Sequence, residues 1–352
     1  MAILIIPAAG LSTRFGLDKP KFLLQSPHGR PMIAEALMGF RNLEKSKIDS
    51  IYVITQKQFL DGLSIDALTK EIQNILPCPV QFKLIDGPTQ SMVQTLTSML
   101  VDLDDDHEFI VKDCDNSIGI DLSILTDHMN AISYVDLHDY PNVVAHNKSF
   151  IKMNSSRVLD EIIEKEIVSP FINVGCVKFG SVSSFLSAVS EFQISGELFV
   201  SDIVRELISR GEIFHTIKAD NYEDWGTLAE WRQYCARFAT YFVDIDGVLA
   251  MNSDPLKLTQ NWDSFIPLEN NCARLLELQE LVHLVFTTSR HPDYRQSLEK
   301  HLFAVGFRKF DLVMGLPHAK RVLINDFAPT NPYPTSIAVN LPRNSDNLSD
   351  YI

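Results

Sequence analysis

A short apolar run near the N-terminus, Ile3–Ile6, constrains the fold more than any other stretch of this sequence. Such a run predicts a buried strand of a parallel sheet. Pro7 and Gly10 follow it, so the backbone is expected to turn sharply there. Ala8, Ala9 and Gly10 are small enough to let a ligand approach the backbone. Consecutive free N–H groups in such a loop form an anion-binding concavity.

Basic side chains come next, among them Arg14, Lys19 and Lys21. Together with the small loop they predict a site for a polyphosphate, because an arginine fork and a lysine point charge both suit phosphate oxygens. The loop is not a Walker loop, since no Gly-Lys-Ser/Thr sequence ends it.

Apolar strand candidates alternate with helical patterns along the chain, which predicts an α/β protein with a mainly parallel, Rossmann-like sheet. The chain of 352 residues is too long for one compact core, and the pattern restarts near residue 240. We therefore predict two domains, 1–239 and 240–352. The predicted strands are Ile3–Ile6, Ile51–Thr55, Val80–Ile85, Phe109–Lys112, Val143–His146, Val174–Phe179, Tyr241–Val243, Leu281–Phe286, Phe310–Met314, Val322–Ile324 and Ser336–Val339. The predicted helices include Pro31–Asn42, Gln90–Val101 and Thr227–Phe238.

The composition argues against several classes of function. A net charge of -14 does not suit a nucleic-acid-binding face, although a few basic residues and a metal can still form one positive nucleotide pocket. No apolar run reaches membrane-spanning length, and the sequence shows no secretory signal. The 5 cysteines are scattered without CxxC pairs, which is typical of reduced thiols. We expect a cytoplasmic protein that binds neither nucleic acid nor membranes.

The stretch PAAGLSTRFG followed by KPKFLL resembles the signature of the sugar-phosphate nucleotidyltransferases, which join a nucleoside triphosphate to a sugar phosphate and release pyrophosphate. The resemblance implies that Ala8, Ala9 and Gly10 bind the nucleotide and that Arg14 and Lys21 steady its phosphates. The alternative is an ordinary strand–turn–helix of a doubly wound fold that binds another nucleotide ligand.

Two acidic segments agree with that resemblance. Asp113 and Asp115 come at the end of a predicted buried strand, in FIVKDCDNSI, and carboxylates there commonly hold Mg²⁺ between phosphates. The resemblance favours Asp115 as the ligand. EDWGT resembles the family's later D-x-G-T element, which implies that Asp224 is the second metal carboxylate. Either segment alone would be an acidic turn or a helix cap.

The segment GPTQSMVQTL resembles the element that meets the nucleotide base, which implies contacts from Gly87 and Ser91. IIEKE resembles the acceptor-side E-K-P element, so Glu164 and Lys165 are candidates for the acceptor hydroxyls and phosphate. In this element Glu166 replaces the usual proline.

The segment FINVGCVKF resembles the family's N-x-G element, which implies that Asn173 and Gly175 line the acceptor pocket. Taken alone, Asn173 would be a turn former. The order of all these segments along the chain agrees with the family's order.

The segment YFVDIDGVLA carries a second chemistry. Three apolar residues lead to Asp244, Asp246 follows two positions later, and Gly247 permits a tight turn. Side chains two positions apart project from one side of an extended segment. The pair therefore predicts a nucleophile and a neighbouring acid or base around one metal ion.

This segment resembles motif I of the haloacid-dehalogenase-like (HAD-like) phosphohydrolases. The resemblance implies that Asp244 forms an aspartyl-phosphate, that Asp246 protonates the leaving group, and that both contact the metal. Thr287 in LVFTTSR matches the phosphate-binding residue of motif II. Lys320 and Asp326 match the lysine of motif III and the metal ligand of motif IV.

Two departures from that family remain. Lys320 lies so close to the motif IV segment that Arg321 is an alternative, and motif IV shows one carboxylate. The short spans between motifs leave no room for a large cap. A structural copy of the fold without activity stays open.

The sequence therefore predicts a Mg²⁺-dependent enzyme that transfers a nucleotidyl group, with CTP favoured, to a sugar or polyol phosphate. A fused phosphatase is expected, similar to capsule-type bifunctional cytidylyltransferases and suited to surface polysaccharide precursors. The alternatives are a phosphatase with a regulatory nucleotide-binding domain, a transferase with an inert second domain, and a nucleotide-sensing scaffold. The oligomeric state stays open, a homo-oligomer included.

Overall fold

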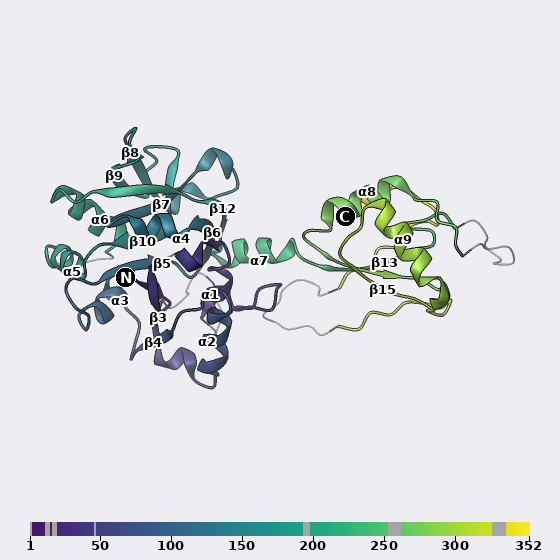
Figure 1. The fold of residues 1–352 in the computed structure, drawn as a ribbon, viewed down its shortest axis with the longest axis horizontal. Coiled ribbons are helices and arrows are strands. Elements are labelled where there is room, and N and C mark those ends of the chain that lie inside the picture. Colours follow the sequence, from purple (N-terminus) through teal and green to yellow (C-terminus); the bar gives the residue numbers. More distant parts are fainter. Residues whose placement is uncertain are drawn as a thin grey trace. The chain divides into compact units, whose positions relative to one another are not determined.

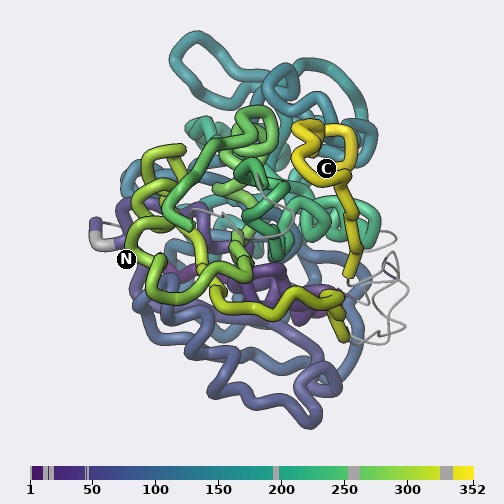
Figure 2. The backbone as a smooth tube through the Cα atoms, turned by 90° about the vertical axis from the view of Figure 1, so that its right-hand side faces the viewer, coloured from purple at the N-terminus to yellow at the C-terminus, as the bar shows by residue number. Residues whose placement is uncertain are grey.

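The chain forms two compact units in a computed structural model, which describes residues 2–10, 15, 20–45, 47–192, 198–252, 262–325 and 336–352. Unit 1 is Met1–Tyr234 and unit 2 is Cys235–Ile352. The division falls a few residues before the expected position, 239. Colour follows the sequence in Figures 1 and 2, from purple at the N-terminus to yellow at the C-terminus. None of the helices within these ranges is long and apolar enough to cross a membrane.

Unit 1 is built on a large, mainly parallel sheet, as the sequence predicts. Its strand order is β11-β7-β10-β5-β1-β3-β4, with β8 paired to β10 and β9 paired to β8. The pairs β1–β3, β1–β5 and β3–β4 are parallel, whereas β10 runs antiparallel to β5, β7 and β8. The strands are β1 (Ala2–Pro7), β3 (Ile48–Gln56), β4 (Val80–Ile85), β5 (Glu108–Lys112), β7 (Asn130–Asp136), β8 (Ser149–Met153), β9 (Leu159–Glu164), β10 (Phe171–Phe179) and β11 (Phe214–Lys218).

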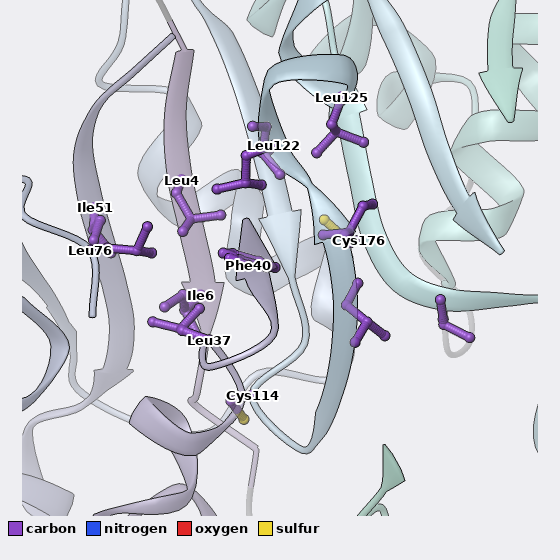
Figure 3. Close-up of a cluster of buried hydrophobic side chains, with 14 of the residues drawn as sticks. Leu4, Ile6, Leu37, Phe40, Ile51, Leu76, Cys114, Leu122, Leu125 and Cys176 are labelled. Carbon is purple, nitrogen blue, oxygen red and sulfur yellow. The ribbon is translucent and has the colours of Figure 1, made fainter. Parts of the chain in front are cut away.

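Helices cover both faces of this sheet (Figure 1). They are α1 (Met32–Glu35), α2 (Ile65–Gln73), α3 (Met92–Leu100), α4 (Leu122–Asp127), α5 (Val182–Ser190) and α6 (Val200–Ser209). Helix α7 (Leu228–Ala236) spans the point in the sequence where unit 1 ends. Ile3 and Ile5 pack with α3, α5 and α6, while Leu4 and Ile6 pack with α1, α2 and α4. Figure 3 shows the second of these clusters. β1 is therefore buried on both faces, which confirms the inference from its apolar run.

A second, three-stranded sheet completes unit 1, in the order β12-β6-β2. Its strands are β2 (Phe40–Arg41), β6 (Asn116–Asp121) and β12 (Asp220–Asp224). β6 follows β5 after only three residues, so the chain passes directly from the large sheet into the small one. The C-terminal end of β5 and the small sheet therefore meet at residues 113–115.

The predicted helix Pro31–Asn42 is wrong beyond its first turn. Helix α1 ends at Glu35, and the chain turns into β2. The carbonyl of Gly39 accepts a hydrogen bond from Ile120 N (3.1 Å), and a Cβ at Gly39 would overlap the Ile118 carbonyl. This close approach to β6 stabilises the strand pairing in place of a longer helix.

The predicted strand Val143–His146 is also wrong. Val143 N donates to Tyr140 O (3.1 Å) in a turn that contains Pro141, and a 3-10 helix follows over Ala145–Asn147. Val143 packs against the apolar core beside the sheet without being part of a strand, so its apolar character reflects packing and not strand pairing.

Unit 2 contains a parallel sheet in the order β13-β14-β15, flanked by two helices. The elements are β13 (Thr240–Asp244), α8 (Glu269–Leu278), β14 (His283–Thr287), α9 (Arg295–Val305) and β15 (Phe310–Val313). Leu284, Phe286 and Leu302 belong to its separate apolar core. The C-terminal residues are tied to this core, because Asp346 accepts from the N–H groups of Asn270 and Asn271 at the start of α8.

Two predicted strands of unit 2 are not formed. Val322–Ile324 and Ser336–Val339 carry no strand pairing in the described part of unit 2, and Ile324 is 88% exposed. A strand needs a neighbouring strand that shares its backbone hydrogen bonds. In the described part of unit 2, β13 pairs with β14 alone, so neither predicted segment extends the sheet beside β13. Apolar composition alone is therefore not enough to form a strand.

Candidate active site

A cavity of about 450 Å³ opens in unit 1 where the large and small sheets meet. Its lining comes from the opening loop, the start of α3, the β5–β6 connection, the strands β8 to β10, and the segment that follows β12. The carboxyl ends of parallel strands are the usual ligand-binding edge of such sheets.

The opening loop is held against β3. Thr55 Oγ1 donates to Ala8 O (3.1 Å) and Gln56 Nε2 donates to Ala9 O (2.5 Å). Ala8, Ala9 and Gly10 all line the cavity, as the sequence predicts. Arg14, the other expected phosphate contact of this loop, lies outside the described residues.

The structure brings Asp115 and Asp224 together. Strand β12 pairs with β6 so that Asp224 lies opposite Asn116, and Trp225 N donates to Asp115 O (2.9 Å). A Cβ built on Gly226 would lie 3.4 Å from Asp224 Oδ1 and 3.9 Å from Asp115 Oδ2. Both carboxylates therefore face the same glycine inside the cavity.

Each of these carboxylates forms an ion pair with a lysine. Lys21 Nζ contacts Asp115 Oδ2, and Lys148 Nζ contacts Asp224 Oδ2. Burial opposes the charge of Lys148, but Tyr222 and Asp224 raise the pKa of Lys148 above the ordinary lysine value. Lys21 is predicted from the sequence as a residue of this site. Lys148 is not predicted, because no motif in the sequence surrounds it.

The two carboxylates suit Mg²⁺, which takes one or two protein carboxylates and completes its shell with water and substrate phosphates. Within the described ranges, no group of three or more His, Cys, Asp or Glu side chains forms a closed metal site. This donor set fits a cation that arrives with a polyphosphate better than a permanently bound one.

A third carboxylate, Asp113, lies beneath this pair. Burial, and then the negative charge of Asp115, raise the pKa of Asp113 from 3.8 to about 6. Lys112 is fully buried beside it and donates from Nζ to Asp113 O (2.7 Å) and Asn116 Oδ1 (2.6 Å). Gly175 has φ +68°, and a Cβ there would overlap Asp113 Oδ2, so the glycine makes room for this carboxylate.

Glu164 lies in the cavity, whereas Lys165 does not line it. Ser149 and Ser201 both donate to Glu164 Oε2, the second at 2.8 Å. Lys165 is exposed, and its Nζ lies 4.3 Å from the centre of the Phe199 ring. The two members of the predicted acceptor-side pair thus have different surroundings.

The remaining residues predicted to contact the nucleotide or the acceptor also lie partly inside and partly outside the cavity lining. Ser91, Asn173 and Gly175 line the cavity, and Gly87 does not. Ser91 also caps α3, because its Oγ accepts from Gln94 N (3.2 Å).

In unit 2, Asp244 and Thr287 lie side by side. They are partners in the register of the parallel strands β13 and β14, and both stand at the carboxyl ends. Asp244 is exposed, but partial desolvation and the neighbouring Asp246 raise its pKa, while Arg321 and Arg343 oppose this rise. Lys320 is exposed, and Asp326 lies outside the described residues. Arg321, the alternative to Lys320, is one of the two arginines whose charge opposes the rise in the pKa of Asp244.

Asp246 is held in a buried ion pair that the sequence does not predict. Arg290 Nη2 lies 2.7 Å from Asp246 Oδ1, and Thr288 Oγ1 donates to Asp246 Oδ2 (2.9 Å). The side chain of Arg290 is 3% exposed. Arg290 Nη1 also donates to the carbonyls of Trp262 (2.9 Å) and Ser264 (3.1 Å). Both oxygens of Asp246 therefore already accept hydrogen bonds.

Known structures share the fold of unit 1. A nucleoside-diphosphate-sugar pyrophosphorylase from Vibrio cholerae RC9 is 19% identical over 66% of this chain and 99% of its own, with a TM-score of 0.55. The inositol-1-phosphate CTP transferase from T. maritima is 14% identical over 65% of this chain and 91% of its own, with a TM-score of 0.51. A UDP-glucose pyrophosphorylase from Acinetobacter baumannii is 14% identical over 67% and 92%, also with a TM-score of 0.51.

These similarities show that unit 1 has the α/β fold of the sugar-phosphate nucleotidyltransferases. The sequence matches no family model and no curated protein.

The pKa of Asp113 predicts a pH-dependent stability. A carboxyl whose pKa is raised on folding contributes most below its unfolded value of 3.8, and that contribution is lost as the pH rises through about 6. We expect Asp113→Asn to stabilise the metal-free protein by on the order of 1–3 kcal/mol near pH 7.5, but not near pH 4. Urea unfolding of unit 1 at both pH values measures this, with Asp104→Asn on the surface as the control. Equal effects of Asp113→Asn at both pH values would contradict the assignment.

Proposed function

We propose that unit 1 transfers a nucleotidyl group from a nucleoside triphosphate to a sugar or polyol phosphate and releases pyrophosphate. The observation that carries the proposal is the meeting of Asp115 and Asp224 in one cavity with the opening loop and Lys21. The shared fold supports it. Two carboxylates and a lysine beside a small-residue loop suit a magnesium-bound triphosphate.

In this proposal an oxygen of the acceptor phosphate attacks the α-phosphorus of the nucleotide. The bond from the α-phosphorus to the bridging oxygen breaks, and pyrophosphate leaves with the electron pair. Mg²⁺, held by Asp115 and Asp224, would neutralise charge on the phosphates. Lys21 would offset charge at the transferred group, and the backbone N–H groups of Ala9 and Gly10 would face the phosphates, whereas that of Ala8 donates to Ile54 O (2.8 Å). The protein acts by positioning and electrostatics and forms no covalent intermediate.

CTP is the proposed nucleotide, and a phosphorylated sugar or polyol is the proposed acceptor. The KDCDN segment and the opening loop support this, because they resemble capsule-type cytidylyltransferases. One protein of similar fold is an inositol-1-phosphate CTP transferase. The product would be an activated building block for a surface polysaccharide.

The proposal predicts that Asp115→Asn and Asp224→Asn each reduce pyrophosphate release at least about 100-fold. Each substitution removes a charged metal ligand from a site that works through charge neutralisation. A coupled pyrophosphate assay with the four nucleoside triphosphates and a panel of sugar and polyol phosphates measures the loss.

Asp220→Asn on the same strand is the matched control, because Asp220 pairs with Arg41 at the surface. Unchanged pyrophosphate release in Asp115→Asn would overturn the metal assignment.

We further propose that unit 2 is a phosphatase of a phosphorylated pathway metabolite. The adjacency of Asp244 and Thr287 at the carboxyl ends of two parallel strands favours it, with Arg321 and Arg343 acting on Asp244. Thr287 would bind the phosphate while Asp244 attacks the phosphorus, and the ester P–O bond would break as the alcohol leaves. Water would then hydrolyse the aspartyl-phosphate and release inorganic phosphate. The ion pair of Asp246 with Arg290 weighs towards the alternative, an inert structural copy, because an acid catalyst needs an oxygen free to carry a proton.

The two alternatives for unit 2 are separated by phosphate release from p-nitrophenyl phosphate and a panel of sugar phosphates. We expect Asp244→Asn to abolish this release, because it removes the nucleophile, and to leave pyrophosphate release by unit 1 unchanged. Asp311→Asn, an exposed partner of His283, is the control. Absence of phosphatase activity in the unaltered protein with Mg²⁺ present would establish the inert alternative.

A further inference from the structure

Among the described residues that line the cavity of unit 1, two are basic, Lys21 and Lys148. Lys21 lies on the nucleotide side, because it follows the opening loop and contacts Asp115. Lys148 lies at the other end of the carboxylate pair, on Asp224. We propose that Lys148, and not Lys165, binds the phosphate of the acceptor. This inference rests on the proposed function of unit 1.

The neighbours of Lys148 place it on the acceptor side. Lys148 immediately precedes Ser149, whose hydroxyl donates to Glu164. Glu164 belongs to the segment that resembles the acceptor-side element, which makes it a candidate contact for the acceptor. Lys165 N donates to Lys148 O (2.9 Å), so the backbone around Lys148 is fixed to the end of β9. A phosphorylated acceptor held by Glu164 would therefore have Lys148 within the same part of the cavity.

Lys165 is poorly placed for that role. Its backbone has φ +58°, and the residue that follows a strand in this conformation turns away from the strand direction. Its side chain is exposed, and its ammonium lies over the ring of Phe199, a cavity-lining residue, and not on a carboxylate of the cavity. The proline that usually follows this lysine is replaced by Glu166.

The charges of the cavity require a cation at this position. The acceptor phosphate brings between one and two negative charges near neutral pH. It would enter a cavity lined by five acidic residues, which are Asp113, Asp115, Glu164, Asp224 and Glu230. Lys148 pairs with Asp224, a carboxylate that would hold the metal ion, so its ammonium would then be available to donate to an acceptor phosphate oxygen.

The test compares Lys148→Met, Lys148→Arg and Lys165→Met with the unaltered full chain. The surface substitution Lys152→Met is the matched control, because Lys152 lies on β8 and pairs with exposed Glu161. Two quantities are measured. The first is the KM for glucose 1-phosphate or inositol 1-phosphate against the KM for CTP. The second is the calorimetric affinity for inorganic phosphate, with Mg²⁺ and a non-hydrolysable CTP analogue present.

We expect Lys148→Met to raise the acceptor KM and to weaken phosphate binding by on the order of 10- to 100-fold, the contribution of a charge-assisted hydrogen bond. The KM for CTP should change less than about threefold, and Lys148→Arg should restore most of the phosphate affinity. Lys165→Met should have a smaller effect than Lys148→Met. A merely structural role of Lys148 would change both KM values together.

The outcomes separate this inference from the proposed function. Unchanged phosphate affinity in Lys148→Met, or a larger loss in Lys165→Met, would overturn the inference while pyrophosphate release stands. Phosphate binding that depends on Lys148, without pyrophosphate release from any nucleotide, would overturn the proposed function and leave Lys148 as a phosphate-binding residue. A protein that neither binds phosphate nor releases pyrophosphate would contradict both.

Discussion

The antiparallel pairing of β12 with β6 determines the active-site geometry of unit 1. Asp115 comes from the end of β5, and Asp224 comes from a segment more than one hundred residues later. The pairing places Asp224 opposite Asn116, and the hydrogen bond from Trp225 N to Asp115 O fixes the register. Because side chains change faces with each residue, a slip by one position would separate the two carboxylates.

This arrangement concentrates negative charge in a small cavity, and the protein offsets it with lysines. Lys21 and Lys148 each contact one carboxylate, and the buried Lys112 donates to the carbonyl of Asp113 and to Asn116 beside them. Burying ions costs several kcal/mol each, so such pairs are weak evidence for stability. Two such ion pairs in one cavity are better explained by a binding site for a metal ion and phosphates than by a contribution to stability.

Much of unit 1 could be predicted from the sequence because its signals are local. The apolar run of β1 and the acidic residues at the ends of β5 and β12 are signals in short stretches. The structure places the loop that follows β1 and both acidic ends at the cavity. The role of Lys148 could not be predicted, since it depends on contact with Asp224 across the fold. The orientation of Lys165 depends on a positive φ that the sequence alone does not reveal.

In unit 2 as well, local sequence signals predict part of the site, and contacts between distant residues determine the rest. The register of Asp244 with Thr287 follows from two apolar strands that end in the expected residues. The ion pair of Arg290 with Asp246 joins residues that follow β14 and β13. The DxD segment alone gives no sign of this contact. Val322–Ile324 has the apolar composition of a strand but no pairing partner among the described residues. The strand predicted there from its apolar pattern is therefore wrong.

The central claim is that Asp115 and Asp224 hold one metal ion together with a nucleoside triphosphate. Anomalous diffraction at the manganese edge, from crystals soaked with Mn²⁺ and a non-hydrolysable CTP analogue, tests it most directly. We predict a manganese peak within coordination distance of oxygens from both carboxylates and of the analogue's phosphates. A peak that contacts only one carboxylate, or that lies away from the cavity, would contradict the account.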